Sequence, residues 1–256
     1  MKLSEHAITA IRYYLGDVEG NDPFWGDRKA YCTLNALFFP GIANETARAR
    51  EGKRLNPAFL QDIGRLTALC TDLLQAFCDA GTPREITVFR VERLSDCLLR
   101  RELGDTISFT STSASGFLKE YRDKKGLALL RFRIPAGTPC IVMADVLDHY
   151  AKAQEDEVLL PPQTELEFTE IPLSEEERQI TDADGNPPAV SFFVNVCGMR
   201  SVRPDGGCLP AEGAGAGQRV YEALNRGEIP AEEDVRLYCE WKEVFRKNVL
   251  SGIRTN

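Results

Sequence analysis

The chain has 256 residues, of which 43% are hydrophobic and 27% are charged. A chain of this length and apolar content can bury a core of its own, so it needs no disulfide or metal staple and does not read as disordered. Thirty-one Lys and Arg residues stand against 39 Asp and Glu residues, which leaves a net charge of −8. This balance argues against a general binder of nucleic acid or anionic membranes, because such proteins need a basic face.

The sequence contains no apolar stretch that approaches the roughly 18 residues of a membrane span. The first segment carries Glu5 and Arg12, where a signal peptide would be apolar. We therefore expect a chain that is made in the cytosol and does not insert into a membrane. Delivery as an effector without a cleaved signal peptide stays open.

Histidine and cysteine usage limits the metal chemistry. His6 and His149 are the two histidines, and the eight cysteines form no CxxC pair. A multi-histidine site, a zinc ribbon or thioredoxin-like chemistry therefore has little support, and we expect no metal. Cys70, Cys78 and Cys197 lie in or next to apolar runs, which favours buried, reduced thiols over a secreted disulfide framework.

The first 80 residues show helical periodicity. The clearest helix begins at Asn56-Pro57, a cap followed by proline at the first helical position, and ends at Gly81. Apolar residues recur in it at helical spacing, namely Phe59, Leu60, Ile63, Leu66, Leu69, Leu73, Leu74 and Phe77. Weaker patterns predict helices near residues 3–15 and over Arg28–Phe38.

After Gly81 the hydrophobic period becomes that of strands. Short segments rich in β-branched or aromatic residues alternate with turn signals. The predicted strands are Glu85–Val91, Thr106–Thr112, Leu127–Ile134, Pro139–Met143, Glu157–Leu160, Glu165–Ile171 and Val190–Cys197. Helices followed by strands predict an α+β fold with antiparallel sheets, rather than alternating βαβ units.

The C-terminal part changes in composition. Residues 201–217 are rich in glycine and are predicted to form a flexible linker or mobile loop. The spacing of Gly213, Gly215 and Gly217 is not read as a dinucleotide-binding fingerprint, because no strand leads into it and the third glycine is misplaced. A helix is predicted from Pro230, with an apolar stripe of Val235, Tyr238, Trp241, Phe245 and Val249. We expect the stripe to pack on the main domain, with a partner-binding helix as the alternative. The predicted domains are residues 1–200 and a linker with helical extension over residues 201–256.

Two predicted strands carry polar residues that suggest chemistry. Arg90 interrupts the apolar run Val88–Val91, and its planar set of donors suits a phosphate clamp, although an edge residue that reaches solvent is the alternative. The next strand ends in a run of hydroxyl side chains over 110–113. Strand alternation places Phe109, Ser111 and Ser113 on one face.

A third segment combines carboxylates with a strand start. Glu155 and Glu157 share one face, with Asp156 turned away, and the strand that follows ends at Pro161. An acidic run before an apolar strand is ordinarily solvated or protects the strand from aggregation. Paired carboxylates also stabilise positive charge at a sugar carbon, as the cleavage of a glycosidic bond requires.

Taken together and in this order, Arg90, the motif Phe109-x-Ser-Thr-Ser113 and Glu155-x-Glu157 resemble the arginine-specific mono-ADP-ribosyltransferases. The resemblance covers residues 10–200 approximately. It implies an ADP-ribosyltransferase-like α+β fold of two packed, mainly antiparallel sheets around an NAD cleft, with helices before them. It also implies transfer of ADP-ribose from NAD, the substrate, to an exposed arginine of an acceptor protein, without a metal or nucleic acid.

The resemblance implies roles for the NAD-binding residues. Arg90 would hold the pyrophosphate, and Ser111 would hydrogen-bond to Glu157 and fix its side chain. Thr112 and Ser113, together with Phe109, would shape the nicotinamide pocket.

The two glutamates would divide the chemistry. Glu157 would engage the 2′-hydroxyl of the nicotinamide ribose and stabilise the transition state, while Glu155 would orient the acceptor guanidinium and help to remove its proton. His149 and Tyr150, in the loop 145–154, are the candidates for contact with the acceptor. Phe117 is predicted to be a core residue, with stacking on nicotinamide as the alternative.

Other functions stay open at this point. Water could be the main acceptor, which would make the chain an NAD glycohydrolase. A catalytically inactive binding module of the same fold is the second alternative, and an adaptor bound through the C-terminal helix is the third.

Overall fold

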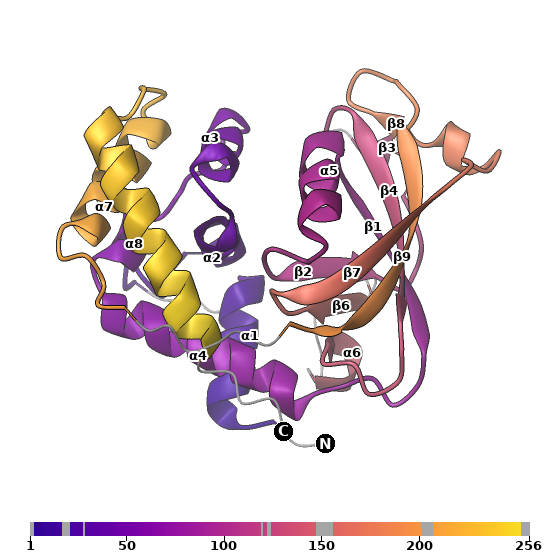
Figure 1. The fold of residues 1–256 in the computed structure, drawn as a ribbon, viewed down its shortest axis with the longest axis horizontal. Coiled ribbons are helices and arrows are strands. Elements are labelled where there is room, and N and C mark those ends of the chain that lie inside the picture. The colour runs from indigo at the N-terminus through magenta and orange to yellow at the C-terminus, as the bar shows by residue number, and fades with distance from the viewer. Residues whose placement is uncertain are drawn as a thin grey trace. The chain divides into compact units, whose positions relative to one another are not determined.

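The computed structural model describes residues 3–16, 21–27, 29–118, 120–121, 124–146, 156–200 and 207–251. The described residues form two compact units (Figure 1), a sheet unit within Asp79–Arg200 and a helical unit that joins Leu3–Cys78 to the C-terminal segment. The sheet unit ends at Arg200, and the C-terminal helices follow it in the chain. Those helices, however, share a unit with the N-terminal ones.

The strands of the sheet unit form a seven-stranded sheet in the order β5-β6-β2-β1-β4-β9-β7 and a separate pair, β3-β8. Neighbouring strands of the large sheet run antiparallel, except for the parallel β4 and β9. The strands are β1 Ile86–Arg93, β2 Thr110–Ser113, β3 Glu120–Tyr121, β4 Leu127–Ile134, β5 Ile141–Val142, β6 Glu157–Leu160, β7 Thr164–Ile171, β8 Thr181–Asp182 and β9 Val190–Met199.

The large sheet has a narrow junction in its middle. Strands β1 and β4 pair along Ile86–Arg93, whereas the register of β1 with β2 consists of Phe89 opposite Ser113. The predicted α+β fold with mainly antiparallel strands is confirmed. At this junction the large sheet divides into the parts β5-β6-β2 and β1-β4-β9-β7.

Strand β4 lies between β1 and β9 and is covered on both faces. On one face, Leu129 belongs to a cluster with Ile180. On the other, Leu130 and Phe132 pack in the larger core with Val88. Coverage on both faces explains why β4 begins with the continuous apolar run Leu127–Leu130.

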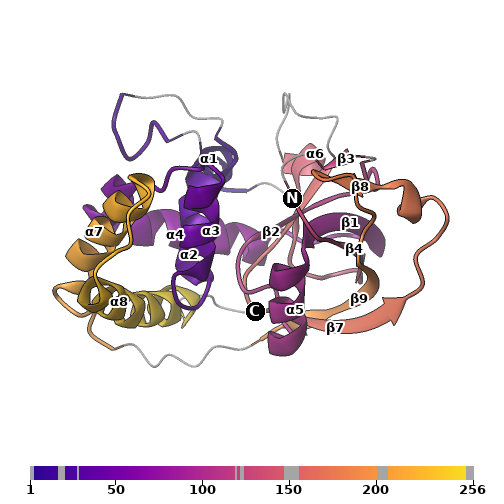
Figure 2. The same ribbon diagram turned by 90° about the horizontal axis from the view of Figure 1, so that it is seen from above.

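The sequence pattern does not predict α5, which covers Leu94–Leu103 and begins directly after β1. The helix packs against β1, β4 and β7 (Figure 2), and its Cys97 is buried in the larger core. It ends at Gly104, whose φ of 66° is the left-handed conformation that favours glycine. Two short segments complete the unit, α6 over Met143–Val146 and the 3₁₀ turn η2 over Glu177–Gln179.

The helical unit contains α1 Glu5–Leu15, α2 Ala30–Phe38, α3 Ala43–Arg50, η1 Pro57–Leu60, α4 Ile63–Asp79, α7 Gly213–Asn225 and α8 Glu232–Ser251. Helices α1 and α2 confirm the two predictions nearest the N-terminus. The long helix predicted from Pro57 is instead divided into η1 and α4. The side chain of Asp62 accepts a hydrogen bond from the Arg65 N–H at 3.0 Å, which caps a new helix start.

The prediction of a linker over residues 201–217 is wrong from Gly213 onwards, because α7 begins there. A Cβ atom on Gly213 would stand 2.2 Å from Cβ of Trp241, and one on Gly217 would stand 2.5 Å from Cδ2 of Tyr238. Helices α7 and α8 lie side by side (Figure 1). The glycines therefore serve a close helix approach and not chain flexibility.

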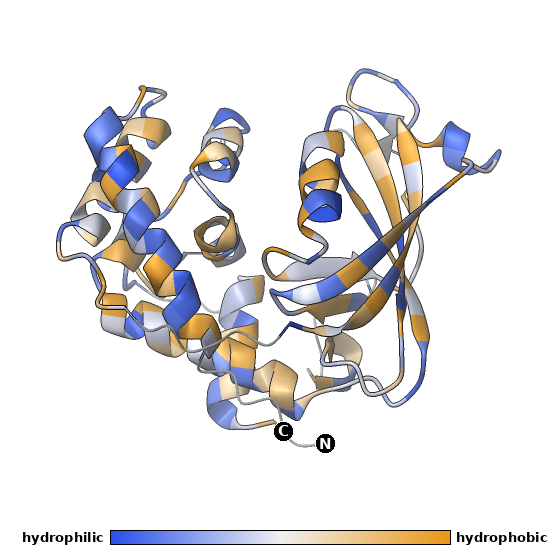
Figure 3. Ribbon diagram, in the orientation of Figure 1, coloured by the Kyte–Doolittle hydropathy of each residue, from blue (hydrophilic) through white to orange (hydrophobic). Residues whose placement is uncertain are grey.

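The predicted apolar stripe of the C-terminal helix is confirmed. Tyr238, Trp241, Phe245 and Val249 are buried, and Val235 is half-buried. Hydrophilic and hydrophobic bands alternate along α8 (Figure 3). Since α8 packs against α7 and α2, the stripe is used within the helical unit.

All eight cysteines are free thiols. Cys32, Cys70, Cys97 and Cys140 are buried, and burial raises the pKa of the Cys70 thiol to about 12. Cys197 is exposed, which corrects the prediction that it is buried. It lies on β9 directly after a buried valine, so strand alternation turns it to the other face.

We expect Gly213→Ala to lower the free energy of unfolding by about 1–3 kcal/mol, because the added methyl group overlaps Trp241. Gly215 is the matched control in the same helix, since a Cβ there meets only the Arg219 side chain, at 3.6 Å. Gly215→Ala should be neutral, or stabilising by up to about 1 kcal/mol. Urea denaturation of both variants measures the difference, and equal effects would contradict the close packing of α7 on α8.

Candidate active site

Three of the segments that the sequence singled out lie on adjacent strands. Strand β2 lies between β1 and β6 in the sheet. Arg90 lies on β1, the segment Thr110–Ser113 forms β2, and Glu157 is the first residue of β6. Antiparallel pairing along the chain therefore brings the three motifs together, although 67 positions separate the first residue from the last.

The Arg90 side chain is held at two points. Its Nε donates to Oε1 of Glu92 at 2.5 Å, and its Nη1 donates to the backbone carbonyl of Ser111 at 2.5 Å. The side chain of Arg90 remains 27% exposed. The guanidinium thus connects β1 to β2 next to the narrow junction of the sheet.

Glu92 continues this arrangement into the protein. Nε of Arg100, on α5, donates to Oε1 of Glu92 at 3.0 Å and to Oε2 at 3.1 Å. Both side chains are 2% exposed. The Glu92 carboxylate is therefore shared between Arg100, which is buried, and Arg90, which reaches solvent.

Glu92, Arg90 and Arg100 form a cluster in which one carboxylate lies between two guanidinium groups. Burial by itself raises the pKa of Glu92, but the charges of Arg100 and Arg90 and their hydrogen bonds lower it below its ordinary value. One carboxylate stands against two guanidinium groups. Nearby Arg93 and Asp96, 3.4 Å apart, offset each other. Arg90 is the guanidinium of the cluster that an anion could reach, because its side chain is 27% exposed.

The strand register decides which serine faces Glu157. Ser113 lies directly opposite Glu157, whereas Ser111 lies opposite Leu159. Residues directly opposite each other in an antiparallel pair have Cβ atoms about 4.5–5.5 Å apart, and diagonal ones about 7–8 Å. Glu157 is 8% exposed. The structure therefore places Ser113 nearer to Glu157 than Ser111, to which the resemblance assigns the contact.

Asp156 fixes the start of β6 and therefore the register of β6 with β2. Its φ is 39°, which turns the chain just before Glu157. The hydroxyl of Ser115 donates to Oδ2 of Asp156 at 2.9 Å, and the Ala114 N–H donates to its carbonyl at 3.0 Å. These bonds tie the end of β2 to the residue that precedes Glu157.

The side chains of Thr112 and Phe109 are buried inside the protein. The Thr112 hydroxyl donates to the Val158 carbonyl at 2.7 Å and is buried. Phe109 is 1% exposed, so its ring belongs to the interior. Neither side chain is accessible as it stands, and their predicted NAD contacts remain predictions.

The predicted core role of Phe117 agrees with its surroundings. Its ring centroid lies 5.1 Å from that of Phe89, with the rings at 75°. It also packs against the cluster of Val91 and Leu129. An edge-to-face aromatic pair of this kind stabilises the β1 side of the site.

The predicted acceptor residues His149, Tyr150 and Glu155 lie outside the described residues, so their roles remain predictions. Of the predicted acceptor loop, only Asp145 and Val146 are described, at the end of α6. The sequence reasoning also missed two residues of the site, Glu92 and Arg100. Period-2 alternation places Glu92 on the face of Arg90, which was an available signal. Arg100 lies on the helix that was not predicted.

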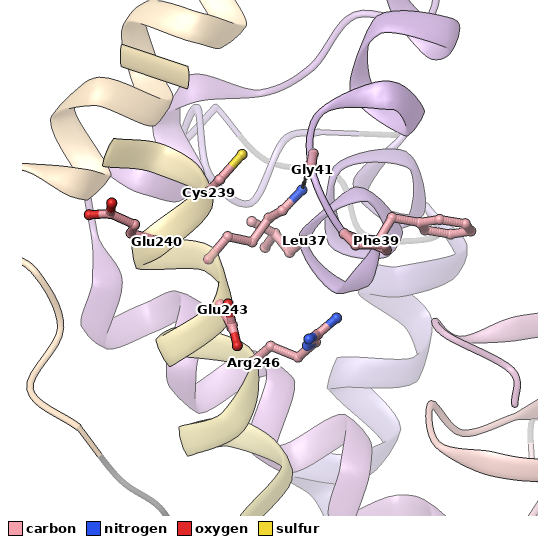
Figure 4. Close-up of a pocket in the computed structure, with 9 residues that line it drawn as sticks. Leu37, Phe39, Gly41, Cys239, Glu240, Glu243 and Arg246 are labelled. Carbon is pink, nitrogen blue, oxygen red and sulfur yellow. Dashed lines mark hydrogen bonds between the residues drawn. The ribbon is translucent and has the colours of Figure 1, made fainter. Parts of the chain in front are cut away.

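In the helical unit, a cavity of about 200 Å³ lies between α2 and α8, and its lining includes Leu37, Lys242 and Arg246 (Figure 4). Lys242 Nζ donates to the buried carboxylate of Glu45 at 2.6 Å. Arg246 donates to the Phe38 carbonyl at 3.1 Å, at the end of α2. These cations hold the helices together, and the cavity contains none of the residues predicted for the site.

Over the described ranges, the acidic, cysteine and histidine side chains form no group of three that could hold a metal ion. No helix in those ranges combines the length and apolar character needed to cross a membrane.

Comparison of the sequence with protein-family models finds no match, and comparison with curated proteins finds none. Solved structures do resemble the chain. The enzymatic component C2-I of the C2 toxin from Clostridium botulinum is 15% identical, with a TM-score of 0.45. The match covers 76% of this chain and 43% of C2-I, so the chain spans less than half the length of that protein.

Two shorter proteins are similar over most of their length. The C3 exoenzyme from Clostridium limosum is 11% identical, with a TM-score of 0.44, over 76% of this chain and 86% of that one. C3stau2 from S. aureus, solved with NAD, is 15% identical, with a TM-score of 0.43, over 77% and 89%. Each of these matches is a similarity of structure at low sequence identity.

We expect Glu92→Gln to lower the free energy of unfolding at neutral pH by about 3–5 kcal/mol, because it leaves the buried Arg100 without its counter-charge. The contribution of the Glu92 carboxylate to the free energy of unfolding should be complete above the pKa of an unfolded glutamate, about 4.3. It should fall as the pH drops through the lower pKa of Glu92 in the folded state. Urea denaturation of the variant and the wild type should show that the difference between their free energies of unfolding becomes smaller from pH 7 to pH 3.

Glu85→Gln is the control for this measurement. Glu85 pairs with Arg133 at 2.8 Å, but both side chains are about half exposed, so little stability should be lost. Equal losses in the two variants at pH 7 would contradict the assignment of a buried ion pair to Glu92.

Proposed function

We propose that the chain, through residues 1–200, is an NAD-dependent mono-ADP-ribosyltransferase that moves ADP-ribose to an arginine side chain of a protein and releases nicotinamide. The observation that carries the proposal is the placement of Arg90 and Glu157 on the two strands that flank β2. A fixed guanidinium suits the diphosphate of NAD. A carboxylate suits the positive charge that develops on the ribose.

Bond cleavage places charge on the sugar. As the bond between C1′ of the ribose and nicotinamide breaks, the electron pair leaves with the cationic nicotinamide ring, which becomes neutral. Positive charge then develops on the ribose, and the Glu157 carboxylate stabilises it. The leaving group needs no proton, so the step requires no general acid.

Transfer is completed by the acceptor. A guanidinium nitrogen of the acceptor arginine forms a bond to C1′ and gives up a proton. We assign this proton to Glu155, which stands two residues before Glu157 in the sequence. A guanidinium is protonated at neutral pH, so it is a poor nucleophile until a carboxylate orients it.

The serines of β2 orient the carboxylate of Glu157. Ser113 lies opposite Glu157 and Ser111 lies diagonal to it, both on the same face of the strand. A hydroxyl that donates to a carboxylate holds it in place and favours its charged form. We assign this role to both serines, with Ser113 as the nearer one.

We expect Glu157→Gln to lower the rate of nicotinamide release from NAD by about 100–1000-fold, because the amide does not match the charge of the transition state. The assay measures nicotinamide with and without an arginine-containing acceptor protein. Glu167→Gln, an exposed carboxylate on β7 of the same sheet, is the control and should keep the wild-type rate. A Glu157→Gln protein with the wild-type rate would show that this carboxylate does not act in cleavage.

Glu155→Gln separates the transferase from the NAD glycohydrolase. The variant should lose transfer to arginine and keep much of the hydrolysis of NAD, because water needs less activation than a guanidinium. The measurement is the ratio of ADP-ribosylated arginine to released nicotinamide in one preparation. If both rates fall by the same factor, Glu155 serves cleavage, and the arginine acceptor loses its main support.

A further inference from the structure

The orientation of Arg90 depends on a carboxylate that the proposed chemistry does not otherwise use. Arg90 donates through Nε to Glu92 and through Nη1 to the Ser111 carbonyl, both at 2.5 Å. We infer that Glu92 is a positioning residue, which holds the Arg90 guanidinium in the orientation that receives the diphosphate of NAD. This inference deepens the proposed function and rests on it.

Glu92 is itself buried and held at both carboxylate oxygens. It is 3% exposed, and Arg100 engages both of its carboxylate oxygens, at 3.0 and 3.1 Å. A carboxylate fixed in this way cannot turn with Arg90 when a ligand arrives. The arrangement therefore pre-orders the guanidinium, whose side chain would otherwise lose rotational freedom on binding.

Arg100 also explains how Arg90 keeps its attraction for an anion. A carboxylate paired with Arg90 alone would neutralise it. Here Glu92 is shared with Arg100, which is 2% exposed, so the cluster of three keeps one positive charge. The exposed member, Arg90, is the one that a diphosphate can reach.

If Glu92 only stabilised the fold and did not position Arg90, a different result would be expected. Glu92 would then exist to neutralise the buried Arg100, and its effect on NAD would vanish once Arg100 is removed. The variant Glu92→Gln/Arg100→Met tests this, because it takes away the buried cation together with its partner. Replacement of a buried ion pair by neutral groups of similar volume is often tolerated, so this variant should fold even if Glu92→Gln does not.

The experiment measures NAD affinity by calorimetry for the full chain and its variants. We expect the dissociation constant to rise about tenfold in Glu92→Gln and in Glu92→Gln/Arg100→Met, which corresponds to the loss of one pre-ordered side chain. In an Arg90→Gln background, Glu92→Gln should have no further effect, because Glu92 acts through Arg90.

Glu177 provides the matched control. It is a buried glutamate of the same unit that pairs with an arginine, Arg131, at 2.9 Å, and it also accepts from Ser191. Glu177→Gln should reduce stability and leave the dissociation constant for NAD unchanged.

The outcomes separate the two claims. If the wild-type chain does not bind NAD, the proposed function fails, and the inference fails with it. If it binds NAD and Glu92→Gln/Arg100→Met binds equally well, the function stands and the positioning role is refuted. A tenfold effect of Glu92→Gln that persists in the Arg90→Gln background would also refute the positioning role.

Discussion

The buried carboxylate of Glu92 is the interaction on which the arrangement of the site depends. It receives the guanidinium of Arg100 from α5 and that of Arg90 from its own strand. One carboxylate accepts hydrogen bonds from Nε of the buried Arg100 and from Nε of the more exposed Arg90. The stability of the sheet unit and the electrostatics of the candidate site therefore have a common physical source.

The same cluster supports the weakest connection in the sheet. β1 and β2 share the register pair of Phe89 and Ser113, whereas β1 and β4 pair along their length. Arg90 adds a hydrogen bond across this junction, to the carbonyl of Ser111. A narrow junction lets the two parts of the sheet diverge, and the chemistry-bearing residues gather on the three strands next to it.

The sequence predicts the elements whose signals are local. β4 and β6 have the predicted bounds, because both are short segments dominated by apolar residues and are followed by a proline. The glycines at the start of α7 led to the prediction of a linker. Their packing depends on Trp241 and Tyr238, which lie 28 and 21 positions further along the chain, so no local pattern shows it. The partner of Glu157 was also beyond local reasoning. The turn at Asp156 precedes a register of β2 and β6 in which Ser113 lies opposite Glu157. A shift of this register by two residues would place Ser111 opposite Glu157 instead.

The most direct test is the crystal structure of the chain with bound NAD. Diphosphate oxygens should lie within hydrogen-bond distance of Arg90, about 3 Å. Arg90 should still be joined to Glu92 and to the Ser111 carbonyl, with the nicotinamide ribose beside Glu157. NAD bound elsewhere, or Arg90 turned away from Glu92 to reach the diphosphate, would contradict the account.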